Sequence, residues 1–509
     1  MMQVLSAAES PVAGDAVASV FLHYHQGPNI DPLQALNRLV NMQLVQSTQQ
    51  GYYLRDADRW YVASQLTEGA SSILGGPDGV HISRHALIKQ FADFLPRMGD
   101  ESIPHQLDQF NLLYNGKDYV AAVEVLKRLE VSLFEQGRYK DLAQYYEQLE
   151  GKLEDHKLVH HRVDTLARIY HRLGDLDRAA KKYEEGLKWV RDAGDQIEEC
   201  HYLANLALCK QESGDLAGTT IYCKAALELL QQIGAGAWEA HIWNIIGETL
   251  ACLGLIFDAK QASEHALALA CDNLQREIEV VARVNLGQHY EELGDFNQAQ
   301  QECESACRIA QAIGFQLGES AARRNQGILK LNKSKFKLAA EEFNKALKLA
   351  DITQSVQLQQ TIRIELAKTL LFDNKLGDAE ATVNEALQYD TPLFSPEAYA
   401  LRGVILHRQG ETGKAVESFY SALEKAQAVV KRTSQYYRGL DVMGLSYSGL
   451  TLLENEPYLD EAIEAYQASG FLTHEPGIVR RRLRLFEALA QSDSEKKLAP
   501  IRKAIYPEQ

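Results

Sequence analysis

Small and apolar residues recur along this chain at a constant interval of 40 residues. Glycine ends an apolar stretch at Gly174, Gly214, Gly254 and Gly294. Small residues stand seven residues before, five residues after and twelve residues after each such turn position, in a register that continues to residue 386 (Ala167, Ala207, Gly247, Gly287, Gly327, Ala367; Ala179, Thr219, Ala259, Ala299, Ala339, Ala379; Gly186, Ala226, Ala266, Ala306, Ala346, Ala386). Apolar and aromatic residues with helical spacing lie between them, which predicts two helices per repeat.

The turn glycine is expected to end the first helix with a positive φ angle. Asp175 and Asp295 follow it and can cap the second helix. Ser334 and Asn374 take the turn position in later repeats, and the interval then shortens to 36 at Gly410. Small residues let the paired helices approach closely, but one pair cannot bury its apolar face alone. The pattern therefore predicts stacked pairs, which is a solenoid.

The order small, aromatic, glycine, alanine, aromatic, alanine resembles the tetratricopeptide repeat. The usual period of that family is about 34 residues, and the longer interval here is similar to its long-helix variants in peptide-sensing and adaptor proteins. The resemblance covers about residues 104–470. It implies an all-α fold, a right-handed superhelical solenoid of antiparallel helix pairs.

The two edges of the array follow the pattern less closely. Residues 104–155 are expected to form degenerate helical repeats, 156–470 the regular repeats, and 471–509 capping helices. The one basic cluster, "RRRLR" at 480–484, is expected to be a solvated face, with a site for an acidic partner as the alternative.

Residues 1–67 predict a small winged-helix-like α+β domain, followed by a connecting helical segment at 68–103. "DPLQALNRLVNMQLVQ" (31–46) predicts a helix that runs into a strand. A turn at Gly51, a second strand and a closing helix at 58–66 follow. "GYYLRDADRWYVASQL" (51–66) resembles the winged-helix segment of STAND signalling ATPases.

In that family a Leu/Met-His-Asp triplet ends the wing, and its His contacts the bound nucleotide. Leu54-Arg55-Asp56 stands here, so the resemblance implies that Arg55 would meet a phosphate. No G-x-x-x-x-G-K-[ST] motif occurs, and "LGGPDGVH" (74–81) lacks Lys-Ser/Thr and an expected flanking strand. The expectation is therefore a sensor half, the product of a split gene or a free-standing adaptor, with a nucleotide-binding ATPase as a partner.

Charge and cysteine content narrow the function classes. The net charge of −16 argues against a general nucleic-acid binder, and the 31–43 helix offers only Arg38. A transcription regulator that binds DNA through the wing is the alternative hypothesis. Seven cysteines without a C-x-x-C pair predict reduced, buried thiols, and no long apolar run predicts a membrane span. We therefore expect a cytoplasmic protein with no membrane partner.

No hydrolase, metalloprotease or dinucleotide motif occurs, so we expect no enzyme activity and no cofactor. His161, His201 and His241 are 40 residues apart and form a column on successive first helices. Packed helices lie about 8–10 Å apart, so three such histidines can hardly share one metal ion.

Asparagines share one position on the first helices, at Asn205, Asn285 and Asn325. In tetratricopeptide proteins this position faces the concave groove, where an amide can pair with the backbone of an extended peptide. Ordinary surface asparagines are the alternative. The predicted groove residues are Arg168, His201, Asn205, His241, Asn244, Glu248, Asn285, Gln288, Arg324, Asn325 and Lys368. The sequence thus predicts a non-catalytic sensor or scaffold, with a protein or peptide as its ligand.

Overall fold

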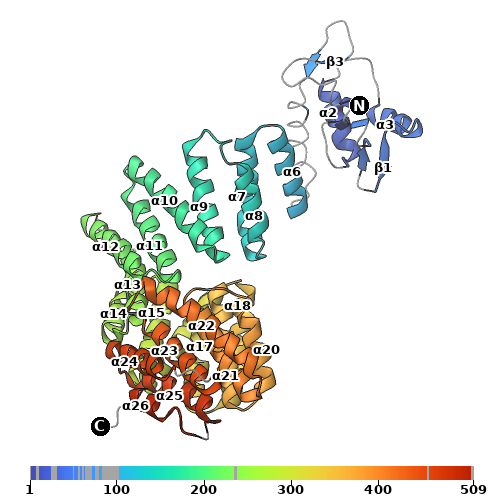
Figure 1. Ribbon diagram of the computed structural model, residues 1–509. Helices are drawn as coiled ribbons and strands as arrows, with labels where there is room; N and C mark the ends of the chain where they lie inside the picture. Colours follow the sequence, from blue (N-terminus) through green and yellow to red (C-terminus); the bar gives the residue numbers. More distant parts are fainter. Residues whose placement is uncertain are drawn as a thin grey trace. The chain divides into compact units, whose positions relative to one another are not determined.

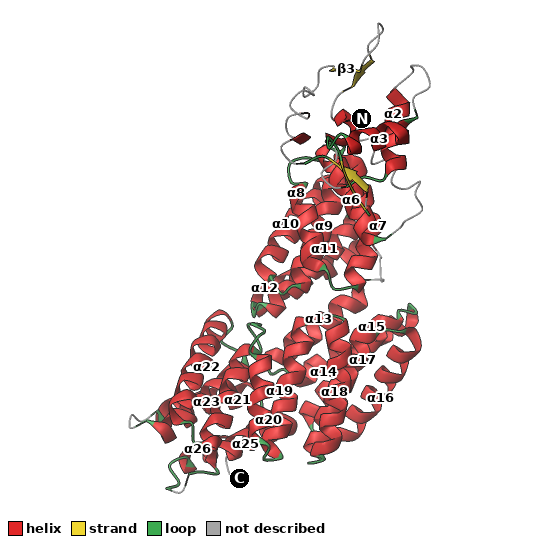
Figure 2. Ribbon diagram, turned by 90° about the vertical axis from the view of Figure 1, so that its right-hand side faces the viewer, coloured by secondary structure: helices red, strands yellow, loops and turns green. Residues whose placement is uncertain are grey.

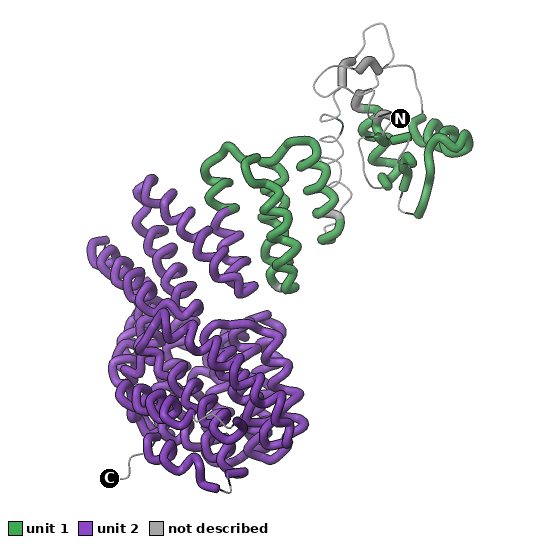
Figure 3. Tube along the Cα trace, viewed as in Figure 1, with its two compact units in different colours: residues 1–162 green, residues 163–509 purple. Residues whose placement is uncertain are grey.

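The computed structural model describes residues 2–6, 11–24, 31–49, 51–55, 58–59, 62, 72–74, 80–82, 87, 102–233, 238–454, 458–493 and 495–505. The chain divides into two compact units, Met1–Arg162 and Val163–Gln509 (Figure 3). The boundary falls within helix α9 (His156–Arg172).

The first unit begins with a small α+β domain. Helices α1 (Met2–Ser6), α2 (Gly14–Tyr24) and α3 (Pro32–Asn41) precede an antiparallel pair of β1 (Gln46–Thr48) and β2 (Gly51–Tyr53). Asp31 caps α3, since its side chain accepts from Leu33 and Gln34. The predicted helix and both strands are confirmed. The winged-helix assignment stays a prediction, and the closing helix at 58–66 lies mostly outside the described residues.

A second strand pair lies in the segment that was expected to be helical. Strands β3 (Ser72–Leu74) and β4 (Val80–Ile82) are antiparallel and enclose "GGPDG". The expectation that no strand flanks residues 74–81 was therefore wrong. Apolar and β-branched residues on both sides of a Gly/Pro/Asp-rich stretch favour a hairpin.

From residue 102 on, the first unit is mostly helical, as the degenerate repeats predict. Helices α6 (Ile103–Asn115), α7 (Tyr119–Glu135) and α8 (Tyr139–Gln148) follow one another. Leu126, Leu133 and Leu142 are fully buried between them.

Successive antiparallel helices form the second unit (Figure 1). They are α10 (Leu176–Ala193), α11 (Gln196–Glu212), α12 (Leu216–Ile233), α13 (Glu239–Cys252), α14 (Ile256–Asp272), α15 (Arg276–Leu293), α16 (Phe296–Ile313), α17 (Gln316–Asn332), α18 (Phe336–Ile352), α19 (Val356–Phe372), α20 (Leu376–Ala386), α21 (Ser395–Gln409), α22 (Thr412–Arg432), α23 (Tyr437–Leu453), α24 (Leu459–Leu472), α25 (Pro476–Ala490) and α26 (Ala499–Ile505). None of the helices described here is long and apolar enough to cross a bilayer.

The turn geometry follows the repeat register. The φ angles of Gly174, Gly214, Gly254 and Gly294 are 76°, 81°, 83° and 86°. Ser334 and Asn374 adopt 54° and 60° in the same position, and short polar residues tolerate this conformation best after glycine. Asp175, Asp215 and Asp295 each accept a backbone N–H of the following helix, so the predicted caps are present.

The small residues of the register are buried at helix–helix contacts. A Cβ atom added to Gly287 would lie 2.5 Å from Cys303 Sγ on the paired helix. One added to Gly327 would lie 2.6 Å from the ring of Phe343. Each first helix therefore needs a small residue where the second helix places a side chain against it.

Helices near the end of the chain pack against helices from the middle of the second unit, among them α13, α15 and α17 (Figures 1 and 2). Thr433 Oγ1 donates to the Gly214 carbonyl at 3.0 Å, and Arg484 donates to the Leu331 carbonyl at 2.8 Å. Gly477 lies so close to Glu291 that an added Cβ would be 2.1 Å from its carbonyl oxygen. The predicted capping helices exist, but α25 also lines the inside of the superhelix.

Candidate functional site

A cavity of about 280 Å³ lies inside the second unit. First helices of successive repeats (α11, α13, α15, α17 and α19) form one side of it. Helices α21, α23 and α25 supply Glu397, Arg438 and Arg481 to the lining. The cavity is therefore lined by segments that lie far apart in the sequence.

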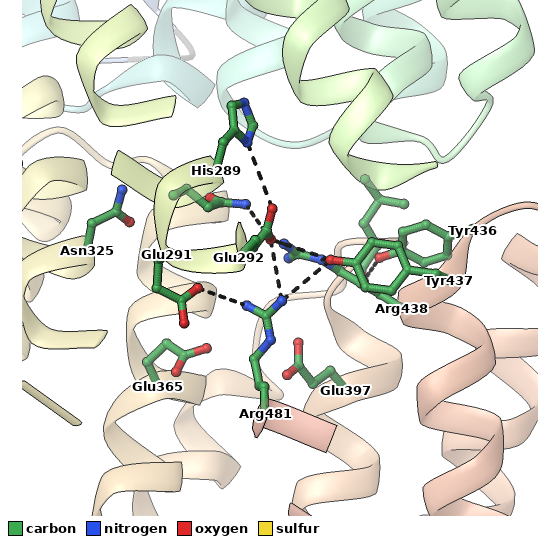
Figure 4. Close-up of polar contacts among 12 residues, drawn as sticks. His289, Glu291, Glu292, Asn325, Glu365, Glu397, Tyr436, Tyr437, Arg438 and Arg481 are labelled. Atoms are coloured by element: carbon green, nitrogen blue, oxygen red, sulfur yellow. Dashed lines mark hydrogen bonds and ion pairs between the residues drawn. The ribbon is translucent and has the colours of Figure 1, made fainter. Parts of the chain in front are cut away.

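Glu292 anchors an ion-pair network beside this cavity (Figure 4). Its side chain has no exposed surface, and Oε1 lies 2.8 Å from Arg438 and 3.4 Å from Arg481. Tyr437 Oη donates to the same oxygen at 3.4 Å. Burial by itself would raise the pKa of Glu292, but His289 and the two guanidinium groups outweigh it and hold the pKa well below its ordinary value. We call Glu292, Arg438 and Arg481 the clasp, because they join α15 to α23 and α25.

Lys368 forms a second buried ion pair next to the clasp. Its Nζ lies 2.7 Å from Glu365 and 2.6 Å from Glu397, and only 3% of its side chain is exposed. Burial opposes the charge of Lys368, but the two carboxylates outweigh it and raise its pKa. Lys368 was predicted to be a groove residue, but these two ion pairs use its charge to hold α19 against α21.

Five of the predicted groove residues line the cavity: Glu248, Asn285, Gln288, Arg324 and Asn325. Asn325 Nδ2 donates to the Val284 carbonyl at 2.9 Å and so ties α17 to α15. Asn285 is 8% exposed, and its side chain interacts with the Glu248 carboxylate, which offsets part of the effect of burial on the pKa of Glu248. Its Nδ2 has no other polar partner among the described residues.

Glu248 and Arg324 are the two charged residues among these five. Burial raises the pKa of Glu248. Burial also lowers the pKa of Arg324, whose guanidinium donates to Gln288 and Asn325 at 3.1 Å. Both groups are thus kept partly desolvated at the wall of the cavity.

The other predicted groove residues do not line the cavity. Asn205 donates to the His201 carbonyl of its own helix at 3.1 Å, and Arg168 pairs with Asp164 at 3.0 Å. The rings of His201 and His241 lie 5.0 Å and 6.2 Å from Trp238.

Burial, with a smaller effect of His201, lowers the pKa of His241 to about 4. Asn244 is 2% exposed, and neither of its side-chain polar atoms has a hydrogen-bond partner among the described residues. The predicted residues that do line the cavity therefore lie between Glu248 and Asn325, whereas the predicted groove runs from Arg168 to Lys368.

Two further predicted positions lie in the first unit. His161 Nε2 is 2.7 Å from Glu130. Arg55, the predicted nucleotide contact, is exposed and pairs with Asp58 at 2.8 Å. The described residues contain no group of three side chains that could hold a metal ion.

The basic cluster at 480–484 is not a solvated face. Arg481 belongs to the clasp, Arg482 is 5% exposed and pairs with Asp441 at 2.6 Å, and Arg484 lies over the Phe372 ring at 4.3 Å. The expectation failed because α25 packs inside the superhelix, where acidic side chains face it. The acidic groups that pair with this cluster, Glu292 and Asp441, belong to the same chain.

Sequence reasoning missed Glu291, Glu292, Glu397 and Arg438. Carboxylates are abundant in this chain, so two adjacent glutamates carry no distinguishing pattern. Only the cluster that contains Arg481 was conspicuous, as the single basic run of an acidic protein.

Family comparison identifies the repeats. Residues 165–180, 280–313 and 364–430 match models of the tetratricopeptide repeat. The chain therefore contains tetratricopeptide repeats. The matched segments lie in α9 and α10, in α15 and α16, and in the stretch from α19 to α22. No curated protein matches the chain.

Several solved tetratricopeptide structures have a similar fold. A STAND protein with a tetratricopeptide repeat sensor from Pyrococcus horikoshii is 15% identical, with a TM-score of 0.43. The match covers 85% of this chain and 63% of that protein. A Rap protein complexed with competence and sporulation factor is 14% identical, with a TM-score of 0.47, and the match covers 74% of this chain and 99% of that one.

Proposed function

We propose that the protein is a non-catalytic sensor that binds a short peptide in the cavity of its tetratricopeptide superhelix. The observation that carries the proposal is the shared wall of Asn285, Glu248 and Arg324, which line one cavity. Asn285 and Glu248 interact with each other at this wall and present one amide and one carboxylate to the cavity. Buried polar groups gain free energy from further hydrogen bonds, so a ligand that pairs with both is favoured.

The size of the cavity supports a small ligand. Ligand pockets occupy about 300–1,000 Å³, and this cavity has a volume of about 280 Å³. It can admit a few residues of an extended peptide but no folded domain. Its walls come from α15 and α17 on one side and from α23 and α25 on the other, so a ligand would contact the two arginines of the clasp, Arg438 and Arg481.

The experiment is affinity selection from a synthetic library of random pentapeptides on the immobilised full chain, read by mass spectrometry and followed by calorimetry on the selected peptides. We expect Asn285→Ala to weaken binding about 5- to 30-fold, since one hydrogen bond is lost. Asn205→Ala is the matched control, because Asn205 lies outside the cavity, and it should bind as the wild type does. A wild-type protein that selects no peptide would refute the proposal.

The role in a STAND system rests on the N-terminal resemblance alone. We propose it as a second step, in which an occupied cavity changes how the protein contacts a nucleotide-binding ATPase. Co-purification of the full chain with an ATPase encoded beside it, with and without the selected peptide, tests this step. A complex that the peptide does not alter would contradict it.

A further inference from the structure

Three tyrosines near the end of the chain lie against one another outside the cavity. The rings of Tyr447 on α23 and Tyr458, just before α24, stack with their centroids 5.9 Å apart and an angle of 22° between their planes. Tyr420 on α22 has its Oη 3.0 Å from Tyr458 Oη and donates to the Glu454 carboxylate at 2.7 Å. Its side chain is exposed, and none of these residues lines the cavity. We call the three tyrosines and Glu454 the tyrosine patch.

Helix packing does not account for Tyr420. The aromatic residue that fills the core at this point of α22 is its neighbour Phe419, which is fully buried. Tyr420 stands ten residues after the turn position Gly410, and the equivalent position of six earlier repeats is exposed and polar (Glu184, Lys224, Glu264, Glu304, Asn344, Asn384). Tyrosine is enriched where proteins bind each other, because it combines an apolar ring with a hydrogen-bonding group. The exposed ring therefore favours a contact outside the helix pair.

Other tyrosines of the second unit show what a ring beside a carboxylate can hold. Tyr290 Oη donates to Glu264 at 3.2 Å, as Tyr420 donates to Glu454. Lys260 Nζ lies 5.6 Å from the centroid of the Tyr290 ring and 3.5 Å from Glu264. Two more cations each contact a ring and a carboxylate: Arg178 with Tyr170 and Asp175, and Lys425 with Tyr399 and Asp390. In these places the cation–π attraction and the ion pair act on the same charge.

The tyrosine patch has the rings and the carboxylate, but no cation of the described residues is recorded with them. Neither an ion pair to Glu454 nor a Lys or Arg over the three rings occurs among the described contacts. A carboxylate can accept about four hydrogen bonds, so Glu454 keeps acceptor sites beyond the one that Tyr420 uses. Exposed Glu417 and Glu424 lie on the same face of α22 as Tyr420 and add negative charge.

We propose that the tyrosine patch is a docking site for an arginine side chain of a partner protein. The patch lies outside the cavity, so this inference goes beyond peptide sensing. A guanidinium group can stack on a tyrosine ring and donate parallel hydrogen bonds to a carboxylate, whereas an ammonium group has no plane to stack. The acidic surroundings disfavour nucleic acid and acidic protein segments.

The experiment compares two libraries of synthetic heptapeptides with blocked termini on the immobilised full chain. The central residue is arginine in one library and citrulline, which has a similar shape but no charge, in the other; the remaining positions are random. Mass spectrometry identifies the retained peptides. We expect retention from the arginine library only, and weaker retention as the salt concentration rises.

Three variants of the full chain locate the binding. Tyr420→Asn introduces the residue that the two preceding repeats carry at this position, and should weaken the selected peptides about 3- to 30-fold. Glu454→Gln should weaken them about 2- to 5-fold. Asn384→Ala is the matched control, because Asn384 is exposed at the equivalent position of α20, and it should bind as the wild type does. The libraries are compared on the wild type, so they decide the question even where a variant does not fold.

Two results would overturn this assignment. Equal retention of the two libraries by the wild type, including no retention of either, would exclude recognition of an arginine. An arginine preference that persists undiminished in Tyr420→Asn would place the binding elsewhere on the chain. Both results leave peptide sensing untouched, because that proposal is tested through Asn285 in the cavity.

Discussion

Removing the negative charge of Glu292 tests whether the clasp holds α23 and α25 against α15. In Glu292→Gln the side chain keeps its size, but Arg438 and Arg481 lose the carboxylate that lies 2.8 Å and 3.4 Å from them. Breaking a buried ion pair costs about 3–5 kcal/mol, because the remaining charge stays desolvated. Arg438 and Arg481 keep 25% and 27% of their side-chain surface exposed, so we expect the lower end, about 3 kcal/mol.

The loss of stability should be confined to the helices near Glu292, because repeat proteins can unfold locally, a few helices at a time. Hydrogen exchange read by mass spectrometry should show faster exchange in α25 and α23, by roughly 100-fold for a change of about 3 kcal/mol. Helix α18 should exchange as in the wild type. Glu304→Gln is the control, since Glu304 is exposed on α16 and bonds only to Gln300 among the contacts described. Unchanged exchange in α25 of Glu292→Gln would refute the structural role of the clasp.

The same group predicts a pH dependence. The folded-state pKa of Glu292 lies below its unfolded value of about 4.3. Its contribution to stability is therefore fully present above that unfolded value and is lost as the pH falls through the folded one. Exchange in α25 should accelerate in acid in the wild type, beyond the intrinsic effect of pH, and less so in Glu292→Gln. An equal acid response in both proteins would contradict the assignment.

Three further predictions follow from the packing of the repeats. Gly327→Ala should lower stability by about 1–3 kcal/mol in thermal unfolding, because the new Cβ meets a ring at 2.6 Å, whereas Gly377→Ala meets nothing within 4 Å and should not destabilise. Asp295→Ala should cost about 1 kcal/mol through the lost cap of α16. Alkylation at pH 8 should modify exposed Cys271 well before Cys303, where burial raises the pKa to about 12; faster labelling of Cys303 would contradict this packing.

The repeat register was predictable because it depends on local chemistry. Turn conformation at Gly254 or Asn374, capping by Asp295 and close helix packing at Gly287 are each decided by neighbours within one helix pair. The 40-residue interval repeats these local rules, so each repeat supports the interpretation of the next. The expectation that all thiols are buried was too general, because Cys271 lies exposed at the end of α14.

The composition of the site was predictable only in part. The asparagine position on the first helices pointed to the inner face, and Asn285 and Asn325 do line the cavity. Asn205 occupies the same position, yet it bonds to its own helix. The repeat position predicts that a side chain lies on the inner face of its helix, but it does not predict which repeats line the cavity.

The sequence by itself determined the helix pairs, their turns and the face on which polar residues gather. Only the tertiary structure decided that α25 enters the superhelix, so that Arg481 meets Glu292 from 189 residues away. Contacts at such a separation leave no period in the sequence, because they depend on the accumulated rotation of many repeats. The same packing decides which buried charged side chains form ion pairs, as Glu292 does with Arg438 and Arg481.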